Sequence, residues 1–107
     1  MEHIFEAFQN SFQPDEKAIF IANVKDEKNE EGDLMLTNKR MVFYPAKPKE
    51  INDVLFINID LIDTVTRTEK GLIVSSGDKK GTYEIEHLKE DFIQKLKGLN
   101  ANIQLSS

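Results

Sequence analysis

The side chains of this chain that could do chemistry are few, and their spacing is unfavourable for catalysis. The two histidines, His3 and His87, have no nucleophile near them in the sequence. His87 and Asp91 are four residues apart, so one helical face would carry both and supply two of the ligands that a metal ion needs. Two ligands are too few, and such residues more often form a surface pair. We therefore predict a protein that is not an enzyme and that has neither a metal site nor a cofactor.

Composition narrows the function classes further. The chain has 107 residues, no cysteine and a formal net charge of −5. Without cysteine it has no disulfides and no thiolate chemistry, and an acidic surface repels nucleic acids. The first residues carry acids where a signal peptide carries bases, and no apolar run is long enough to span a membrane. These features predict a cytoplasmic protein with a single domain over residues 1–107.

The elements that must position any site are most clearly marked over residues 32–45. Two apolar, β-prone runs, 34–36 and 41–44, meet there across a short polar turn, which is the pattern of a β-hairpin. Before it, β-prone residues over 17–24 predict one strand, and a polar loop over 25–33 joins that strand to the hairpin.

Four further strands are predicted after the hairpin, because short β-prone runs recur between turn residues. These runs are 55–59, 63–67, 72–74 and 82–86. No helical pattern separates them, so the seven strands are expected to form an antiparallel meander that curls or closes to protect its edges.

Both ends of the chain have a helical period instead. Before Pro14, the apolar residues at helical spacing are Ile4, Phe5, Phe8 and Phe12, which predicts a short amphipathic N-terminal helix. Near the other end, one helical face carries Leu88, Phe92, Leu96 and Leu99. Such a helix needs an apolar surface to cover, and the open end of a small barrel provides one.

This order of elements resembles the pleckstrin-homology (PH) superfold, and the residue pattern of the chain is similar to that of the GRAM and bacterial PH-like branch. The residues that carry the resemblance are Phe5, Phe8 and Phe12 before Pro14-Asp15-Glu16-Lys17; Gly32-x-Leu34-x-Leu36-Thr37-Asn38-Lys39-Arg40-x-Val42-Phe43-Tyr44; Ile59-x2-Ile62-x2-Val65; and Phe92-Ile93-x2-Leu96. The similarity covers residues from about 5 to 99. It implies a mainly β protein: a partly open seven-stranded antiparallel barrel that one C-terminal helix caps.

The resemblance also implies a binding rim at the other end of the barrel, made of the loops between strands 1 and 2, 3 and 4, and 6 and 7. In lipid-binding relatives this rim holds the headgroup. Here the loops 25–33, 45–53 and 77–81 carry net charges of −3, 0 and +1, whereas a phosphoinositide needs a converging set of cations. The basic pair Lys39–Arg40 is expected to be a solvated turn at the opposite end.

Two roles follow as alternatives. The first is a module for protein–protein interaction or scaffolding, which would use a sheet edge, the rim or the groove beside the terminal helix. The second is a weak peripheral module that binds anionic membrane lipid through loop lysines. The candidate contact residues for a partner or lipid are Lys25, Tyr44, Lys47, Lys49, Lys79 and Lys80. Free sheet edges leave a homo-oligomer open, and the sequence does not identify the partner.

The apolar faces of these elements predict the core. Its expected members are Ile19, Ile21, Leu34, Leu36, Met41, Phe43, Ile57, Ile59, Val65, Val74, Tyr83, Ile85, Leu88, Phe92 and Leu96.

Overall fold

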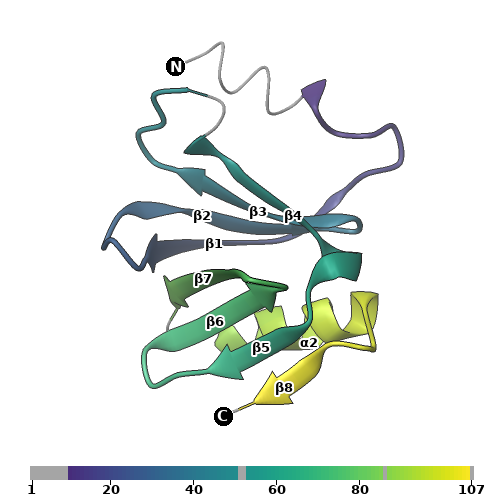
Figure 1. Ribbon diagram of the computed structural model, residues 1–107. Coiled ribbons are helices and arrows are strands. Elements are labelled where there is room, and N and C mark those ends of the chain that lie inside the picture. Colours follow the sequence, from purple (N-terminus) through teal and green to yellow (C-terminus); the bar gives the residue numbers. More distant parts are fainter. Residues whose placement is uncertain (1–9, 51–52, 86, 107) are drawn as a thin grey trace.

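The strands form one open sheet. A computed structural model describes residues 10–50, 53–85 and 87–106 of the chain. Across the sheet the strands follow the order β4-β3-β2-β1-β7-β6-β5-β8 (Figure 1). Their bounds are β1 Ala18–Asp26, β2 Glu31–Thr37, β3 Arg40–Pro45, β4 Leu55–Asn58, β5 Thr64–Arg67, β6 Gly71–Ser76, β7 Lys79–Glu84 and β8 Gln104–Ser106. A short 3-10 helix, η2 (Ile59–Leu61), connects β4 to β5.

The hairpin predicted over residues 32–45 is confirmed. A two-residue turn at 38–39 joins β2 to β3, and their register pairs Leu34 with Phe43 and Leu36 with Met41. All four side chains are buried. Residues two apart on a strand share a face, so both strands direct one apolar face towards the same core.

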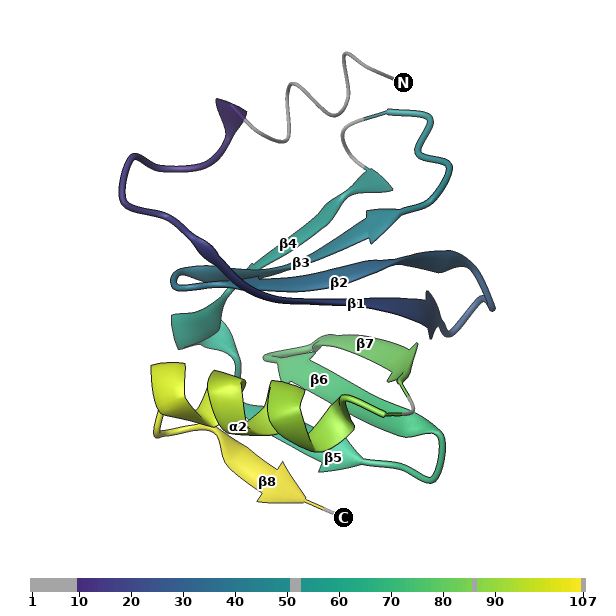
Figure 2. The ribbon, with the colours of Figure 1, turned by 180° about the vertical axis from the view of Figure 1, so that it is seen from behind.

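The sheet folds over on itself where β1 meets β7. Two residue pairs join these strands, Lys25 with Glu84 and Asp26 with Tyr83. Figures 1 and 2 show the resulting layers, β1–β4 facing β5–β8, with the helix α2 (Lys89–Leu99) beside the second layer. The main apolar core consists of Phe20, Val24, Leu34, Leu36, Met41, Phe43, Ile57, Ile59, Ile62, Val65, Leu72, Val74, Tyr83, Ile85, Phe92, Ile93, Leu96 and Ile103.

The C-terminal helix packs on this core much as the sequence predicts. Phe92 is fully buried, and its ring meets that of Phe20 edge-on at 5.3 Å between centroids. Burial of such a side chain stabilises the fold by roughly 1.5–3 kcal/mol. The expectation for Leu88 is wrong: it is 42% exposed, because the helix begins at Lys89 and Leu88 occupies the N-cap position.

The inward face of β1 differs from the prediction. Ile19 and Ile21 were expected in the core, but they are 39% and 56% exposed, while Phe20 and Val24 are buried. Both alternating sets of β1 residues are apolar, so periodicity could not separate them. Phe20 takes the inward position because its ring packs on Phe92 of α2, and the register of β1 with β2 shifts between Ala18 and Phe20.

The predicted strand number is also wrong. Over the described residues the sheet has eight strands, and β8 lies parallel to β5, with Val65 opposite Leu105. After α2 the chain turns back, buries Ile103 in the core and extends along the free edge of β5. The last segment was not predicted as a strand because three exposed residues, 104–106, leave no clear pattern.

The predicted N-terminal helix falls almost wholly outside the described residues, since Ile4, Phe5 and Phe8 lie in the segment 1–9. Of its apolar residues the structure describes Phe12, which packs against a second, smaller cluster around Val42 and Val54. In the described part of the chain, no helix has the length and apolar character needed to cross a membrane.

Candidate functional site

A pocket of about 450 Å³ opens between the β1–β2 turn, the β3–β4 loop and β7, and we call it the rim pocket. This volume is within the range of about 300–1,000 Å³ that is common for ligand sites. Carboxylates and lysines both line it. The carboxylates are Asp26, Glu27, Glu30 and Asp53, and the lysines are Lys28, Lys47, Lys49 and Lys80. The β1–β2 and β3–β4 loops thus contribute as the family resemblance implies, whereas β7 contributes through the strand itself.

Two of the carboxylates hold their own loops in shape. Oδ1 of Asp26 accepts hydrogen bonds from the backbone N–H groups of Lys28 and Glu30, both at 2.9 Å. Oδ2 of Asp53 accepts from two backbone N–H groups, the nearer being that of Lys49 at 2.8 Å. Aspartate commonly closes turns in this way, so these two carboxylates are already bonded to backbone N–H groups at the mouth of the rim pocket.

The other two carboxylates are placed for contact across the pocket. Oε2 of Glu27 accepts the backbone N–H of Thr82 at 3.3 Å, which ties the β1–β2 turn to β7. Among the described residues, none donates a hydrogen bond to the carboxylate of Glu30. Glu30 therefore keeps its accepting capacity for solvent or a ligand.

Two aromatic rings close the floor of the rim pocket, and both are almost fully covered: Phe43 is 5% exposed and Tyr83 is 2% exposed. The ring centroids of Phe43 and Tyr83 lie 5.5 Å apart. Both rings fit because glycine stands beside them: a Cβ atom on Gly32 would approach the Phe43 ring to 2.7 Å, and one on Gly81 would approach the Tyr83 hydroxyl to 2.6 Å. The hairpin glycine and the glycine of β7 thus leave room for the floor.

The hydroxyl of Tyr83 lies at the boundary between the main core and the rim pocket. The residue is 2% exposed, and no residue in the described part of the chain forms a hydrogen bond with its hydroxyl. The oxygen still reaches the rim pocket, because every fully enclosed side-chain N or O atom of the described residues is paired. Burial and the nearby carboxylates of Glu27 and Asp26 raise the pKa of Tyr83 well above its usual value, so the hydroxyl stays protonated at neutral pH.

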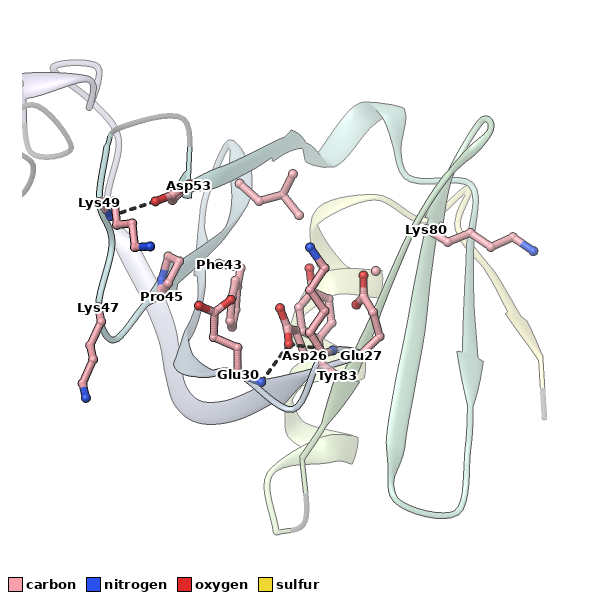
Figure 3. A pocket seen from close by; sticks show the side chains of 13 residues that line it. Asp26, Glu27, Glu30, Phe43, Pro45, Lys47, Lys49, Asp53, Lys80 and Tyr83 are labelled. Atoms are coloured by element: carbon pink, nitrogen blue, oxygen red, sulfur yellow. Dashed lines mark hydrogen bonds between the residues drawn. The ribbon is translucent and has the colours of Figure 1, made fainter.

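The candidate contact residues from the sequence do not form one cluster. Lys47, Lys49 and Lys80 line the rim pocket, but Figure 3 shows the side chains of Lys47 and Lys80 extending away from its carboxylates. Lys25 lines a separate groove of about 310 Å³ between β1, β7 and the start of α2.

The remaining two candidates lie elsewhere. Lys79 lines neither the rim pocket nor the groove beside Lys25. Tyr44 packs against the small cluster around Val42 and Val54. The prediction that Tyr83 belongs to the core is confirmed, but the sequence analysis did not foresee that this residue also lines the rim pocket. Gly81, two positions earlier on the same strand face, was the available signal.

The basic pair at the hairpin turn is not a simple solvated turn. Nε of Arg40 donates to Oε2 of Glu16 at 2.8 Å, and the two side chains are 14% and 1% exposed. The same oxygen accepts from the hydroxyl of Thr37 at 2.6 Å, and the Arg40 guanidinium lies over the rings of Phe12 and Phe56 at 5.2 and 4.6 Å. This cluster fastens the segment before β1 to the hairpin.

The His87–Asp91 pair does not come together as a ligand pair. Asp91 forms an ion pair with Lys95 at 2.9 Å, and His87 is exposed and lines the groove beside Lys25. Over residues 10–50, 53–85 and 87–106, no three histidine or carboxylate side chains are grouped closely enough to hold a metal ion.

Comparison with known proteins identifies the fold. No family model matches the chain, and no curated protein matches it in sequence. Among solved structures, the N-terminal PH domain of Vps36 superposes with a TM-score of 0.65 at 18% identity, covering 85% of this chain and 83% of that one. The hSac2 domain of the human phosphoinositide phosphatase Sac2 gives 0.55 at 13% identity, covering 97% and 87%. At such low identity these likenesses show the fold alone, and this chain has the PH-like fold.

Proposed function

We propose that this chain is a non-catalytic binding module, close to the GRAM and bacterial branch of PH-like domains, and that it binds a protein partner through the rim pocket. The observation that carries the proposal is the arrangement of charge there. Figure 3 shows Asp26, Glu27 and Glu30 gathered around the two aromatic rings, whereas the ammonium groups of Lys47 and Lys80 face outwards. A multiply phosphorylated headgroup needs the opposite arrangement, because each phosphate must regain the hydration that it loses.

The experiment is affinity capture from the native cell, with three versions of the chain as bait. Wild type is compared with Glu30→Lys, which reverses one charge in the rim pocket, and with Asp60→Lys, which makes the same change on η2. Figure 1 shows η2 at the opposite end of the sheet from the β1–β2 turn. We expect one reproducible partner with wild type and Asp60→Lys, and its loss with Glu30→Lys. If no partner is captured, or if Glu30→Lys captures it equally well, the proposal is wrong.

Lipid binding is the second candidate, and the lysines at the mouth of the rim pocket favour it. Lys47 and Lys80 point outwards, as a membrane surface would require. Co-sedimentation with liposomes at low salt tests this role. Binding to anionic vesicles no stronger than to neutral vesicles excludes it, and a loss of binding in Lys47→Gln combined with Lys80→Gln supports it.

Other features of the proposed role stay predictions. The free edges of the sheet are β4 and β8, and pairing of either edge between copies would give a homo-oligomer. Sedimentation analysis across a concentration series measures this directly. The cytoplasmic location and the single domain over 1–107 are likewise predictions.

A further inference from the structure

The rim pocket combines two features that together favour a cation. Carboxylates surround it, and the Tyr83 hydroxyl, which has no hydrogen-bond partner among the described residues, opens onto it. With Lys47 and Lys80 directed outwards, four carboxylates face two lysines, Lys28 and Lys49, so the interior of the rim pocket has a negative balance.

The cation that fits is an organic one. As noted above, the described carboxylates are not grouped as metal ligands. The rings of Phe43 and Tyr83 are 5% and 2% exposed, so they close the floor without offering a face for stacking. The rim pocket therefore suits a cation that donates several hydrogen bonds at once to its carboxylates and to the Tyr83 hydroxyl.

Tyr83 makes the strongest argument for a ligand. The Tyr83 oxygen is not enclosed in the free protein, so a ligand that covered it without forming a hydrogen bond would cost free energy, whereas a ligand that donates to it would not. Tyr83 is 2% exposed and tolerates this position only because Gly81 leaves space for its oxygen. A ligand N–H group that reaches the floor would donate to this oxygen and would be neutralised by Glu27 and Asp26 beside it.

We infer that the rim pocket receives an arginine side chain from an exposed segment of the protein partner. Arginine suits it better than lysine, because a guanidinium is planar, is weakly hydrated and carries five N–H donors in a fixed fork. In this arrangement the guanidinium donates to the Tyr83 hydroxyl and pairs with Glu30 and Glu27. The inference rests on the proposed function and adds the chemistry of the partner.

The test uses the full chain and short peptides of defined charge. Amide NMR signals of Lys28, Glu30 and Thr82 are followed, because these N–H groups bond to carboxylates of the rim pocket. The probes are N-acetyl-Gly-Arg-Gly-amide, the same peptide with neutral citrulline in place of arginine, and inositol trisphosphate. We expect the arginine peptide alone to shift these three signals in a saturable way. A citrulline peptide that binds equally well, or inositol trisphosphate that shifts the same signals at a lower concentration, overturns the inference.

Three variants sharpen the result. Tyr83→Phe removes only the unpartnered hydroxyl, and Glu30→Gln removes one charge that the described residues do not use. Each variant is expected to lower the affinity for the arginine peptide roughly tenfold, because it loses one hydrogen bond to a charged group. Glu31→Gln makes the same charge change one residue further on and outside the rim pocket, and should leave affinity unchanged.

A separate readout distinguishes binding from folding. Tyr83→Phe should unfold at the same urea concentration as wild type or a higher one, because the hydroxyl forms no hydrogen bond with any described residue. Unchanged peptide affinity in Tyr83→Phe refutes the inference.

The two proposals can also fail independently. If affinity capture recovers a partner equally with wild type and Tyr83→Phe, a protein-binding role stands and the arginine site is wrong. If the arginine peptide binds as expected but no protein is captured, the pocket chemistry stands and the proposed function is wrong.

Discussion

Replacing Glu16 by Gln tests how the buried ion pair holds the N-terminal segment to the hairpin. Oε2 of Glu16 accepts from Arg40 and Thr37, and Oε1 accepts from the backbone N–H of Gln13 at 3.1 Å. The glutamine amide has one oxygen in place of the two carboxylate oxygens. In one orientation its NH2 group faces the backbone N–H of Gln13, and in the other it faces Nε–H of Arg40; neither group can accept a hydrogen bond. The substitution keeps the size of the side chain and removes part of its bonding.

The magnitude follows from burial. Breaking a buried ion pair by changing one partner costs about 3–5 kcal/mol. Arg40 is 14% exposed and rests on two aromatic rings, so we expect a value near the lower end, about 3 kcal/mol. For a urea m-value of about 1–3 kcal/mol/M, the unfolding midpoint should fall by roughly 1–3 M.

The neighbouring residue provides a matched control. Asp15 pairs with Lys39 at 3.0 Å, but its side chain is 74% exposed, and exposed pairs contribute little because water and salt screen them. Asp15→Asn should therefore leave the urea midpoint unchanged within error. Equal midpoints for Glu16→Gln and Asp15→Asn would refute the claim that burial decides the contribution of each pair.

Three further predictions concern pH, the helix and two glycines. Burial opposes ionisation of Glu16, but hydrogen bonds from Thr37, Gln13 and Arg40 outweigh it and lower its pKa below 4.5. The stability that this carboxylate contributes is therefore complete above about pH 4.5 and is lost as the pH falls through the lowered pKa. An acid titration followed by circular dichroism should show a smaller loss of stability in Glu16→Gln than in wild type. Phe92→Ala should lower the free energy of unfolding by about 3–5 kcal/mol, and a melting temperature close to wild type would contradict the packing of α2. Gly71→Ala should lower the urea concentration at the unfolding midpoint strongly, because a Cβ atom there would lie 1.9 Å from a backbone oxygen of β7. Gly98 in α2 has open space around it, so Gly98→Ala should instead raise the free energy of unfolding by about 0.5–1 kcal/mol.

The amino-acid sequence alone determines the elements whose causes are local. The hairpin over 32–45 follows from two apolar runs and a short turn between them, and the terminal helix follows from the period of Phe92 and Leu96. Because the order of these elements restricts the possible topologies, the PH-like fold could be predicted before any coordinates were known. The two loops that border the rim pocket were predicted for the same reason.

Tertiary structure alone decides three other matters. It selects the inward face of β1, because Ile21 and Phe20 are both apolar and the choice depends on the fit to Phe92 across the core. It creates β8, since a three-residue strand has no stable pairing until α2 returns the chain to the edge of β5. It also brings Tyr83 from β7 under the acidic β1–β2 turn, more than 50 residues away in sequence. Charge summed over a loop cannot report which ammonium or carboxylate groups point into a pocket, because side-chain direction depends on the packing of strands that meet only in the folded chain.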